Sequence, residues 1–162
     1  MKTAIYPGTF DPITYGHIDV IKKSLNIFDR VVVATTDNVH KNYHFSINER
    51  LDIINNSLFK DLKLNKKKIK VISFNNLTID LCKKYKANAI IRGLRAVSDF
   101  EYEFQLAGMN KKLNSNIETM FLMSDVENQI ISSKFVKEIA SLGGNINRFV
   151  TKYTVKMLKN KF

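Results

Sequence analysis

Short apolar runs alternate along this chain with segments of helical periodicity, and that alternation constrains the fold more than any other feature. The clearest run is RVVVATT at residues 30–36, whose nearly unbroken β-branched side chains are typical of a strand covered on both faces. The preceding segment spaces Ile18, Ile21 and Leu25 along one face of a helix. Similar apolar runs recur further along the chain. The expected strands are residues 3–7, 30–36, 69–74, 87–93 and 117–123.

The segments between and after these runs carry the signs of helices. Ser46 and Glu49 are spaced as a capping box, in which each side chain accepts a hydrogen bond from the other residue's backbone N–H. Ser98 and Glu101 repeat that spacing at the start of another helical segment. The expected helices are residues 17–28, 46–58, 78–87, 99–113, 132–142 and 154–161.

Strands that alternate with helices in this way predict an α/β fold with a doubly wound, five-stranded parallel sheet. No linker, internal repeat or low-complexity stretch interrupts the sequence, so we expect one domain over residues 1–162 with a C-terminal helix. Such sheets bind ligands at the carboxyl ends of their strands, near the point where the strand order reverses. We therefore expect the strand-to-helix joints to share one edge of the sheet. These joints are residues 6–17, 35–46, 92–99 and 124–133.

The charge balance indicates which partners suit the chain. The 162 residues include 26 Lys and Arg against 15 Asp and Glu, and the net charge of +11 favours anionic partners. The excess lysine is scattered, with its densest cluster at residues 63–70, and we interpret most of it as solvated surface. There is no 18-residue apolar run for a membrane span and no signal-peptide pattern. The single Cys82 is expected to be a small buried hydrophobe in a reducing cytoplasm.

The first joint is YPGTFDPITYGH at residues 6–17, and it ends in the first turn of an expected helix. Gly16 lets a phosphate approach the backbone, and the free N–H groups at a helix start favour an anion. His17 would present its imidazole to the same anion, and Thr9 its hydroxyl. The joint matches neither the dinucleotide-binding glycine pattern nor a Walker A loop. For TYGH alone, a helix cap with a hydrogen-bonded histidine is the simpler alternative.

The joint after the fourth strand carries Arg92 and Arg95 around Gly93. Paired guanidinium groups at a strand end suit phosphate, because each binds two oxygens at once. The alternative is a pair of surface arginines in ion pairs with nearby carboxylates, which fits the spacing about equally well. The carboxylates in question are Asp99, Glu101 and Glu103.

The remaining joints add hydroxyl groups and a lysine. Ser132 and Ser133 would cap the helix after the fifth strand, with spare hydroxyl and N–H groups facing the same edge. Lys41 could reach in from the long loop after the second strand. The histidines are too scattered to propose a zinc site, and no nucleophile elbow is present. The residues therefore predict a site that holds anions.

Together these joints resemble the phosphopantetheine adenylyltransferase family over about residues 2–158. The segments that carry the likeness are YPGTFDPITYGHIDVI, IIRGLRAVSDFEYEFQLAGMN and FLMSDVENQIISSKFVKEIA. TYGH matches the T/H-x-G-H signature of the nucleotidyltransferase superfamily, and ISS matches its second signature. RGLRAVSDFEYE is specific to the one family. The resemblance implies a Rossmann-like nucleotidyltransferase fold.

The same resemblance implies a reaction. ATP would transfer its adenylyl group reversibly to 4′-phosphopantetheine, giving dephospho-coenzyme A and pyrophosphate, with Mg²⁺ as cofactor, in the penultimate step of coenzyme A synthesis. The enzyme would be a cytoplasmic homohexamer inhibited by coenzyme A, with no nucleic-acid or membrane partner.

The resemblance also implies roles for individual residues, with no metal ligand among the side chains. His17 would be the catalytic residue, stabilising the α-phosphate as charge develops. The matching phosphopantetheine positions are Thr9, Lys41, Thr78 and Arg92. The matching ATP positions are Thr9, Phe10, His17, Gly93, Leu94, Arg95, Glu103, Asn128, Gln129, Ile130, Ile131, Ser132, Ser133 and Lys134.

Two positions depart from the family pattern. Lys134 stands where many members have a third serine, and Asn128 where an aromatic residue is common. Two other functions remain open. One is a sister nucleotidyltransferase with another phosphorylated acceptor. The other is a basic nucleic-acid-binding protein, which the dispersed lysines and the absence of tryptophan disfavour.

Overall fold

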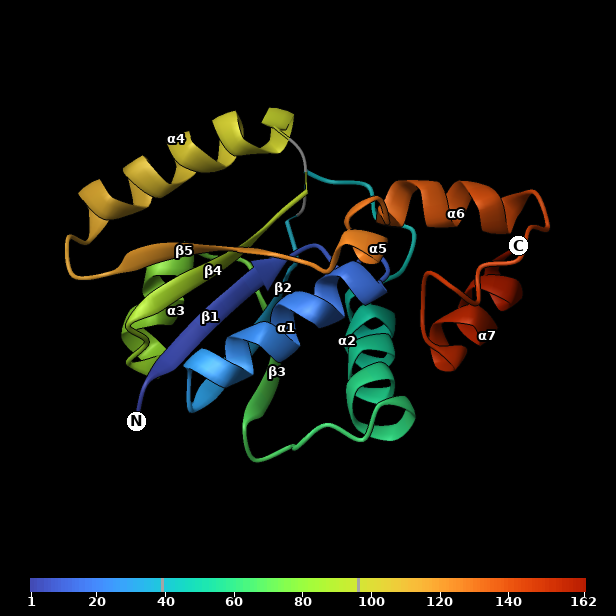
Figure 1. The fold of residues 1–162 in the computed structure, drawn as a ribbon, viewed down its shortest axis with the longest axis horizontal. Helices are drawn as coiled ribbons and strands as arrows, with labels where there is room; N and C mark the ends of the chain where they lie inside the picture. Colours follow the sequence, from blue (N-terminus) through green and yellow to red (C-terminus); the bar gives the residue numbers. More distant parts are fainter. Residues whose placement is uncertain (39, 96) are drawn as a thin grey trace.

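The computed structural model of the chain describes residues 1–38, 40–95 and 97–162. Its strands join into one parallel sheet, as predicted (Figure 1). The strands are β1 (Thr3–Gly8), β2 (Arg30–Thr36), β3 (Ile69–Phe74), β4 (Ala89–Leu94) and β5 (Glu118–Met123). Their order across the sheet is β3-β2-β1-β4-β5. The chain therefore winds outward from β1 to β3 and then crosses to β4, so the order reverses between β1 and β4.

The predicted double coverage of β2 is confirmed. Val31 and Val33 belong to one hydrophobic cluster, whereas Val32 and Ala34 belong to the other, on the opposite face of the sheet. All of these side chains are fully buried, and burying each valine contributes roughly 1.5–3 kcal/mol of transfer free energy. Alternate residues of one strand thus bind two layers of helices to the sheet.

The helices divide between these two faces (Figure 1). The first cluster takes buried residues from α1 and α2, and the second takes them from α3, including Cys82, which is buried as predicted. The helices α6 and α7 lie together beside α2. The helical elements are α1 (Tyr15–Ile27), α2 (Ile47–Asn55), the π-helix η1 (Asn56–Asp61), α3 (Thr78–Tyr85), α4 (Val97–Leu113), α5 (Val126–Gln129), α6 (Ser133–Ser141) and α7 (Lys152–Lys161).

Several helix boundaries differ from the prediction. The helix expected over residues 46–58 is α-helical only to Asn55 and continues as the π-helical η1. The short helix α5 was not expected, and α7 begins two residues earlier than its apolar pattern indicates. Of the helices in the described part of the chain, none is long and apolar enough to cross a membrane.

Of the two capping boxes predicted from the sequence, the first can be compared with the structure. Ser46 accepts a hydrogen bond from the Glu49 backbone N–H, and Glu49 accepts one from the Ser46 backbone N–H, which confirms the first capping box. The second predicted pair is Ser98 and Glu101. The structure describes the backbone of Ser98 but not its side chain, so this pair lies outside the comparison.

Candidate active site

At two glycines, the loop from β1 to α1 approaches other groups so closely that a side chain would require them to shift. A Cβ on Gly8 would lie 2.7 Å from the ring of Phe10, and a Cβ on Gly16 would lie 3.0 Å from the carbonyl oxygen of Asn128. Phe10 itself is buried in a left-handed backbone conformation, with φ of 47°. Its ring packs edge-on against Tyr6 and His17, with centroid distances of 5.3 and 5.1 Å. The loop therefore holds His17 in place through aromatic packing.

His17 both caps α1 and faces the site. Its Nδ1 accepts a hydrogen bond from the backbone N–H of Thr14 at 3.0 Å and lies 3.0 Å from the Thr14 hydroxyl oxygen. An Nδ1 that accepts from a backbone N–H carries no proton, so in the neutral ring the proton sits on Nε2. The simpler alternative for TYGH, a hydrogen-bonded histidine at a helix cap, is thus confirmed for Nδ1. The Nε2–H is a second group, which can still donate to a ligand.

The imidazole is neutral at physiological pH. Burial, and to a lesser extent the nearby positive charge of Arg95, lowers the pKa of His17 to about 4. The group can therefore donate one hydrogen bond from Nε2 without first gaining a proton. It is poorly suited to act as a general base near pH 7, because its Nδ1 is already engaged.

Arg92 in β4 and Arg95 just after it are both paired with carboxylates of α4. Arg92 donates from Nε and Nη2 to the two oxygens of Glu103, each at 2.6 Å, and from Nη1 to the Pro7 carbonyl at 3.1 Å. Arg95 lies 3.4 Å from Asp99. Both arginines therefore form the ion pairs of the alternative interpretation, and both also line the pocket. Glu103 fixes the guanidinium plane of Arg92, which has N–H groups left for a ligand.

The start of α6 supplies donors on the far side of the pocket. Ser132 caps the helix by accepting from the Phe135 backbone N–H at 3.2 Å, and the Ser133 hydroxyl donates to the Pro12 carbonyl at 2.7 Å. The first N–H groups of a helix have no intrahelical partner, and the positive end of its dipole favours anions. Two helix starts, those of α1 and α6, therefore serve one cavity.

Asp11 joins three separate segments around this cavity. Its carboxylate accepts from the backbone N–H groups of His44 and Phe45, at 2.8 and 2.9 Å, and lies 3.1 Å from the Lys137 ammonium. The first loop, the loop after β2 and helix α6 are thereby held in one arrangement.

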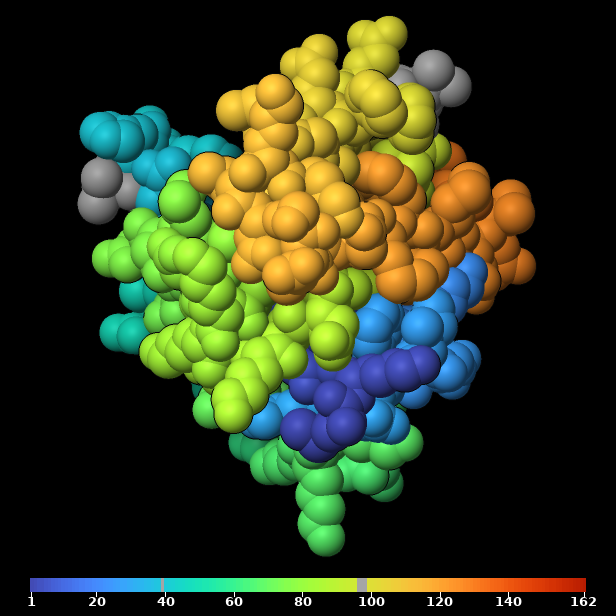
Figure 2. Space-filling view, turned by 90° about the vertical axis from the view of Figure 1, so that its left-hand side faces the viewer, coloured from blue at the N-terminus to red at the C-terminus, as the bar shows by residue number. Residues whose placement is uncertain are grey.

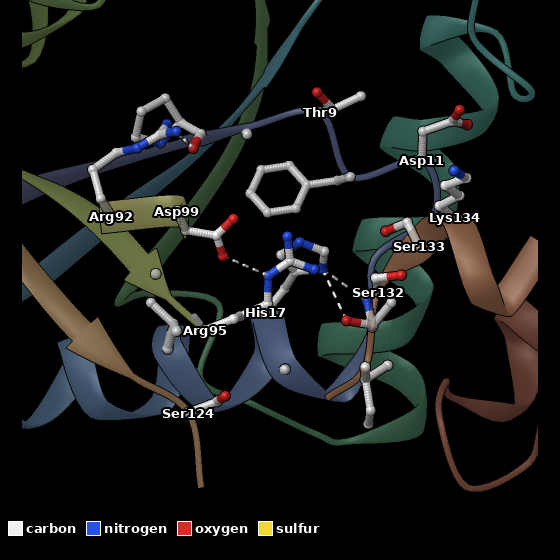
Figure 3. Close-up of a pocket in the computed structure, with 18 of the residues that line it drawn as sticks. Thr9, Asp11, His17, Arg92, Arg95, Asp99, Ser124, Ser132, Ser133 and Lys134 are labelled. Carbon is white, nitrogen blue, oxygen red and sulfur yellow. Dashed lines mark hydrogen bonds and ion pairs between the residues drawn. The ribbon is translucent and has the colours of Figure 1, made fainter. Parts of the chain in front are cut away.

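These elements enclose a cleft of about 570 Å³ at the carboxyl ends of β1 and β4, where the strand order reverses. That volume is in the range of ligand-binding clefts, roughly 300–1,000 Å³. Figure 3 shows His17 between Arg92 on one side and Ser133 on the other. The predicted site residues that line the cleft are Thr9, Phe10, His17, Lys41, Arg92, Gly93, Leu94, Arg95, Glu103, Ile131, Ser132, Ser133 and Lys134.

Four predicted site residues do not line the cleft. Thr78 begins α3, which follows the edge strand β3 and packs against β1 and β4, and its side chain is not among those that line the cleft. Asn128 donates to Asp19 of α1 at 2.6 Å, and Gln129 donates to the Ser124 carbonyl at 3.1 Å. Ile130 is 81% exposed. The side chains of α5 thus anchor that helix to its surroundings.

Sequence reasoning missed several residues that line the cleft. Tyr6 and Asp11 lie in the quoted first loop, and no spacing rule singles out either side chain. Tyr43 lies in the loop after β2 and Lys137 in α6, and no motif singles out either residue. Burial raises the pKa of Tyr6 above its usual range, so its hydroxyl stays protonated. Only the folded chain reveals that these side chains converge.

The carboxylates that line the cleft are the candidate protein ligands for a metal ion. Across residues 1–38, 40–95 and 97–162, no three His, Cys, Asp or Glu side chains cluster as ligands. The described carboxylates that line the cleft each face a cation: Asp11 faces Lys137, Asp99 faces Arg95, and Glu103 faces Arg92. To bind one of these carboxylates, a Mg²⁺ ion would have to break its ion pair. Otherwise the ion would be held by oxygen atoms of a bound small molecule and of water.

Comparison with known proteins gives consistent matches. The sequence model of the family described as Cytidylyltransferase-like matches residues 5–139. The phosphopantetheine adenylyltransferase of Pelagibacter ubique is 68% identical over 161 residues, which cover 99% of this chain and 98% of that protein. The phosphopantetheine adenylyltransferase of Caldanaerobacter subterraneus subsp. tengcongensis is 47% identical over 162 residues, covering 100% and 98% of the two chains.

A solved structure supports the fold independently. The nicotinic acid mononucleotide adenylyltransferase of Plasmodium falciparum, complexed with NaAD, superimposes with a TM-score of 0.70. The alignment covers 99% of this chain and 96% of the other, at 18% sequence identity. At that identity the likeness concerns the arrangement of strands and helices.

Proposed function

The chain belongs to the cytidylyltransferase-like family and, within it, to the phosphopantetheine adenylyltransferases, and on that premise we propose that it transfers the adenylyl group of ATP to 4′-phosphopantetheine. The products are dephospho-coenzyme A and pyrophosphate, and the reaction is reversible. The observation that carries the proposal is that the Nε2 donor of His17 lies in one cleft between Arg92 and the start of α6.

The two sides of the cleft suit two phosphorylated ligands. Thr9 follows β1, Lys41 lies in the loop after β2, and Arg92 lies in β4 with its Nη1 against the Pro7 carbonyl of β1; these three side chains would hold the phosphate of the acceptor. Arg95, with Lys134 and the N–H groups at the start of α6, would hold the triphosphate. Lys134 places a positive charge on this second side, where it would stabilise the departing pyrophosphate.

For this reaction the protein mainly has to align the two ligands and stabilise negative charge. The acceptor phosphate is already an anion, so its oxygen can attack the α-phosphorus without a base. Holding the two ligands in line removes much of the entropic barrier. The neutral His17 N–H would then stabilise the negative charge that grows on the α-phosphate oxygens in the transition state. This assignment agrees with a histidine whose pKa of about 4 keeps it uncharged.

We propose that Mg²⁺ enters with ATP and is held by the phosphate oxygens and water. The paired carboxylates of the cleft support this arrangement, because Asp11, Asp99 and Glu103 already face basic side chains. When bound, the ion would neutralise triphosphate charge. Titration calorimetry should then detect Mg²⁺ binding only in the presence of ATP, and heat from Mg²⁺ added to the protein alone would contradict the proposal.

The direct test is pyrophosphate release across a grid of nucleotides and acceptors. We expect release with ATP and 4′-phosphopantetheine that exceeds release with CTP, or with nicotinate mononucleotide as acceptor, by at least about a hundredfold. A higher rate with another pair would assign the chain to a sister reaction. Absence of turnover with every pair would overturn the proposal.

We also propose that the chain is a cytoplasmic homohexamer inhibited by coenzyme A. Helix α4 lies at one edge of the molecule (Figures 1 and 2) and exposes large apolar side chains, which supports burial against another copy. Phe104 is 64% exposed there. We expect Phe104→Glu to reduce the mass seen by sedimentation and Lys112→Ala on the same helix to leave it unchanged. Equal masses for the wild type and Phe104→Glu would contradict this interface. The exposed apolar residues of α4 are Phe100, Tyr102, Phe104, Met109 and Leu113.

A further inference from the structure

Arg50, on the first turn of α2, is fully buried although nothing proposed above uses it. In the sequence it reads as one more charged residue of a surface helix. Instead its side chain lies behind the wall of the cleft, beneath Thr9 and Tyr43, which do line it. A guanidinium group stays charged in proteins, and burying a charge costs free energy unless hydrogen bonds and a counter-ion compensate for it.

One set of contacts connects Arg50 to the loop after β1. Its Nη1 donates to the Thr9 carbonyl at 3.0 Å, and the Thr35 hydroxyl donates to the same carbonyl at 3.0 Å. Nη1 also donates to the Thr35 hydroxyl oxygen at 3.1 Å. The Thr9 carbonyl belongs to the peptide that leads into Phe10, whose φ of 47° is unusual for a side chain of that size. Arg50 and Thr35 thus hold the peptide that positions the Thr9 side chain.

A second set of contacts connects Arg50 to both ends of the loop that carries Lys41. Arg50 donates from Nη1 to the Thr36 carbonyl at 2.7 Å, where β2 ends, and from Nε to the Phe45 carbonyl at 3.2 Å, just before α2. The guanidinium carbon also lies 3.8 Å from the centroid of the Tyr43 ring. One planar group therefore holds the start, the end and an aromatic side chain of this loop.

The charge of Arg50 is only loosely balanced. Its Nη2 lies 3.6 Å from a carboxylate oxygen of Asp37, a side chain that is half exposed. Within the described part of the chain, this buried Nη2 has no hydrogen-bond acceptor. A buried charge without a hydrogen-bonded counter-ion costs folding free energy. Stability alone is therefore a poor explanation for an arginine at this position.

We propose that Arg50 is a positioning residue for the acceptor side of the cleft. This inference rests on the proposed function, in which Thr9 and Lys41 hold the acceptor phosphate. Arg50 acts on the reaction through those two loops and touches neither ligand. The residues proposed for the triphosphate are Arg95, just after β4, and Lys134 at the start of α6, and none of the hydrogen bonds of Arg50 to described residues reaches either segment. Its loss should therefore affect the two substrates unequally.

The variant Arg50→Lys keeps the positive charge but replaces the planar guanidinium group, with its several N–H donors, by a single ammonium group. A single ammonium cannot reach the Thr9, Thr36 and Phe45 carbonyls together. We expect the KM for 4′-phosphopantetheine to rise about tenfold or more, equivalent to about 1.4 kcal/mol of binding, while the KM for ATP stays within about twofold. Thr35→Val, which removes the second donor to the Thr9 carbonyl at constant size, should shift the same KM in the same direction by a smaller factor.

Hydrogen–deuterium exchange gives a readout that needs no substrate. In folded Arg50→Lys we expect faster exchange in the peptide that contains the His44 and Phe45 amides, which are bonded to Asp11, and unchanged exchange at the start of α6. Arg148→Lys, on the exposed segment before α7, is the control and should leave both exchange and kinetics unchanged.

The outcomes separate the two proposals. A selective rise in the acceptor KM together with local loss of protection supports Arg50 as a positioning residue. Unchanged KM values, equal rises for both substrates, or unchanged exchange in the 40–46 peptide overturn it. If Arg50→Lys does not fold, Thr35→Val decides by the same criteria. If the wild type releases no pyrophosphate, the proposed function fails, and the exchange comparison still decides whether Arg50 holds the two loops.

Discussion

Replacing His17 by asparagine would separate the two tasks of its imidazole. The Nδ1 atom satisfies the Thr14 backbone N–H at the start of α1, and the Nε2–H is left for a ligand. The asparagine carbonyl lies close to where Nδ1 was and can accept the same bond, but its amide is too short to reach the position of Nε2. Alanine removes both functions.

The size of the effect follows from the state of the ring. With a pKa of about 4, roughly one molecule in a thousand carries a charged His17 at pH 7. The loss is therefore that of one neutral donor to a growing negative charge, which costs about 10²–10³ in kcat, or about 2.7–4 kcal/mol. We expect small effects on both KM values, because the bond strengthens mainly as the transition state forms.

Stability should distinguish the two variants although their rates agree. Alanine leaves the Thr14 N–H without its acceptor, which costs about 1–3 kcal/mol if the group stays dry. Asparagine should restore most of that loss. Steady-state pyrophosphate release and urea unfolding, each measured on the wild type, His17→Asn and His17→Ala, give the rates and stabilities to compare. His40→Ala, outside the cleft, is the control for removing an imidazole.

Two results would refute this reasoning. A His17→Asn variant as fast as the wild type would make His17 a helix cap only. A rise in KM with kcat unchanged would make it a binding residue whose contact is as strong in the ground state as in the transition state.

Three further outcomes are expected. Arg92→Ala should weaken 4′-phosphopantetheine binding by about tenfold or more, and ATP binding less, in calorimetric titrations; the opposite ranking would exchange the two sides of the cleft. Because the pKa of folded His17 lies below its ordinary value, the unfolded chain binds the extra proton, and stability should be lost as pH falls from about 6.5 to 4, by up to roughly 3 kcal/mol. Urea unfolding of His17→Asn should lack that part of the pH dependence, and identical curves would contradict it. Chelation of divalent ions should abolish turnover, added Mg²⁺ should restore it, and the circular dichroism spectrum should not change; a spectral change would indicate a structural metal.

The strands and helices could be predicted because each is marked by a local pattern of apolar residues. The β-branched run of β2 and the glycines and prolines of the first loop follow short-range rules of chain geometry. The order of the strands does not, since no local pattern states which strands are neighbours. Thr78 illustrates the consequence: it follows β3, which lies at the edge of the sheet, whereas Arg92 and Arg95 lie at the end of β4, beside β1.

The candidate site was predictable where a motif defines a turn and less so where it depends on long-range partners. TYGH placed His17 correctly, because a cap and a free nitrogen are properties of one helix turn. Arg92 was predicted as a phosphate ligand or as a partner of Asp99, Glu101 or Glu103, and only the packing of α4 decides that its partner is Glu103. Arg50 escaped notice because its burial depends on loops 14 and 41 residues away.

The central claim is that one cleft holds both substrates so that the acceptor attacks the α-phosphorus directly. The stereochemical course measures this without reference to rates. ATP that carries sulfur at the α-phosphorus as a single diastereomer should give a product of inverted configuration, as a single in-line displacement requires. Retention of configuration would indicate two successive displacements through an adenylyl-enzyme and would contradict the account.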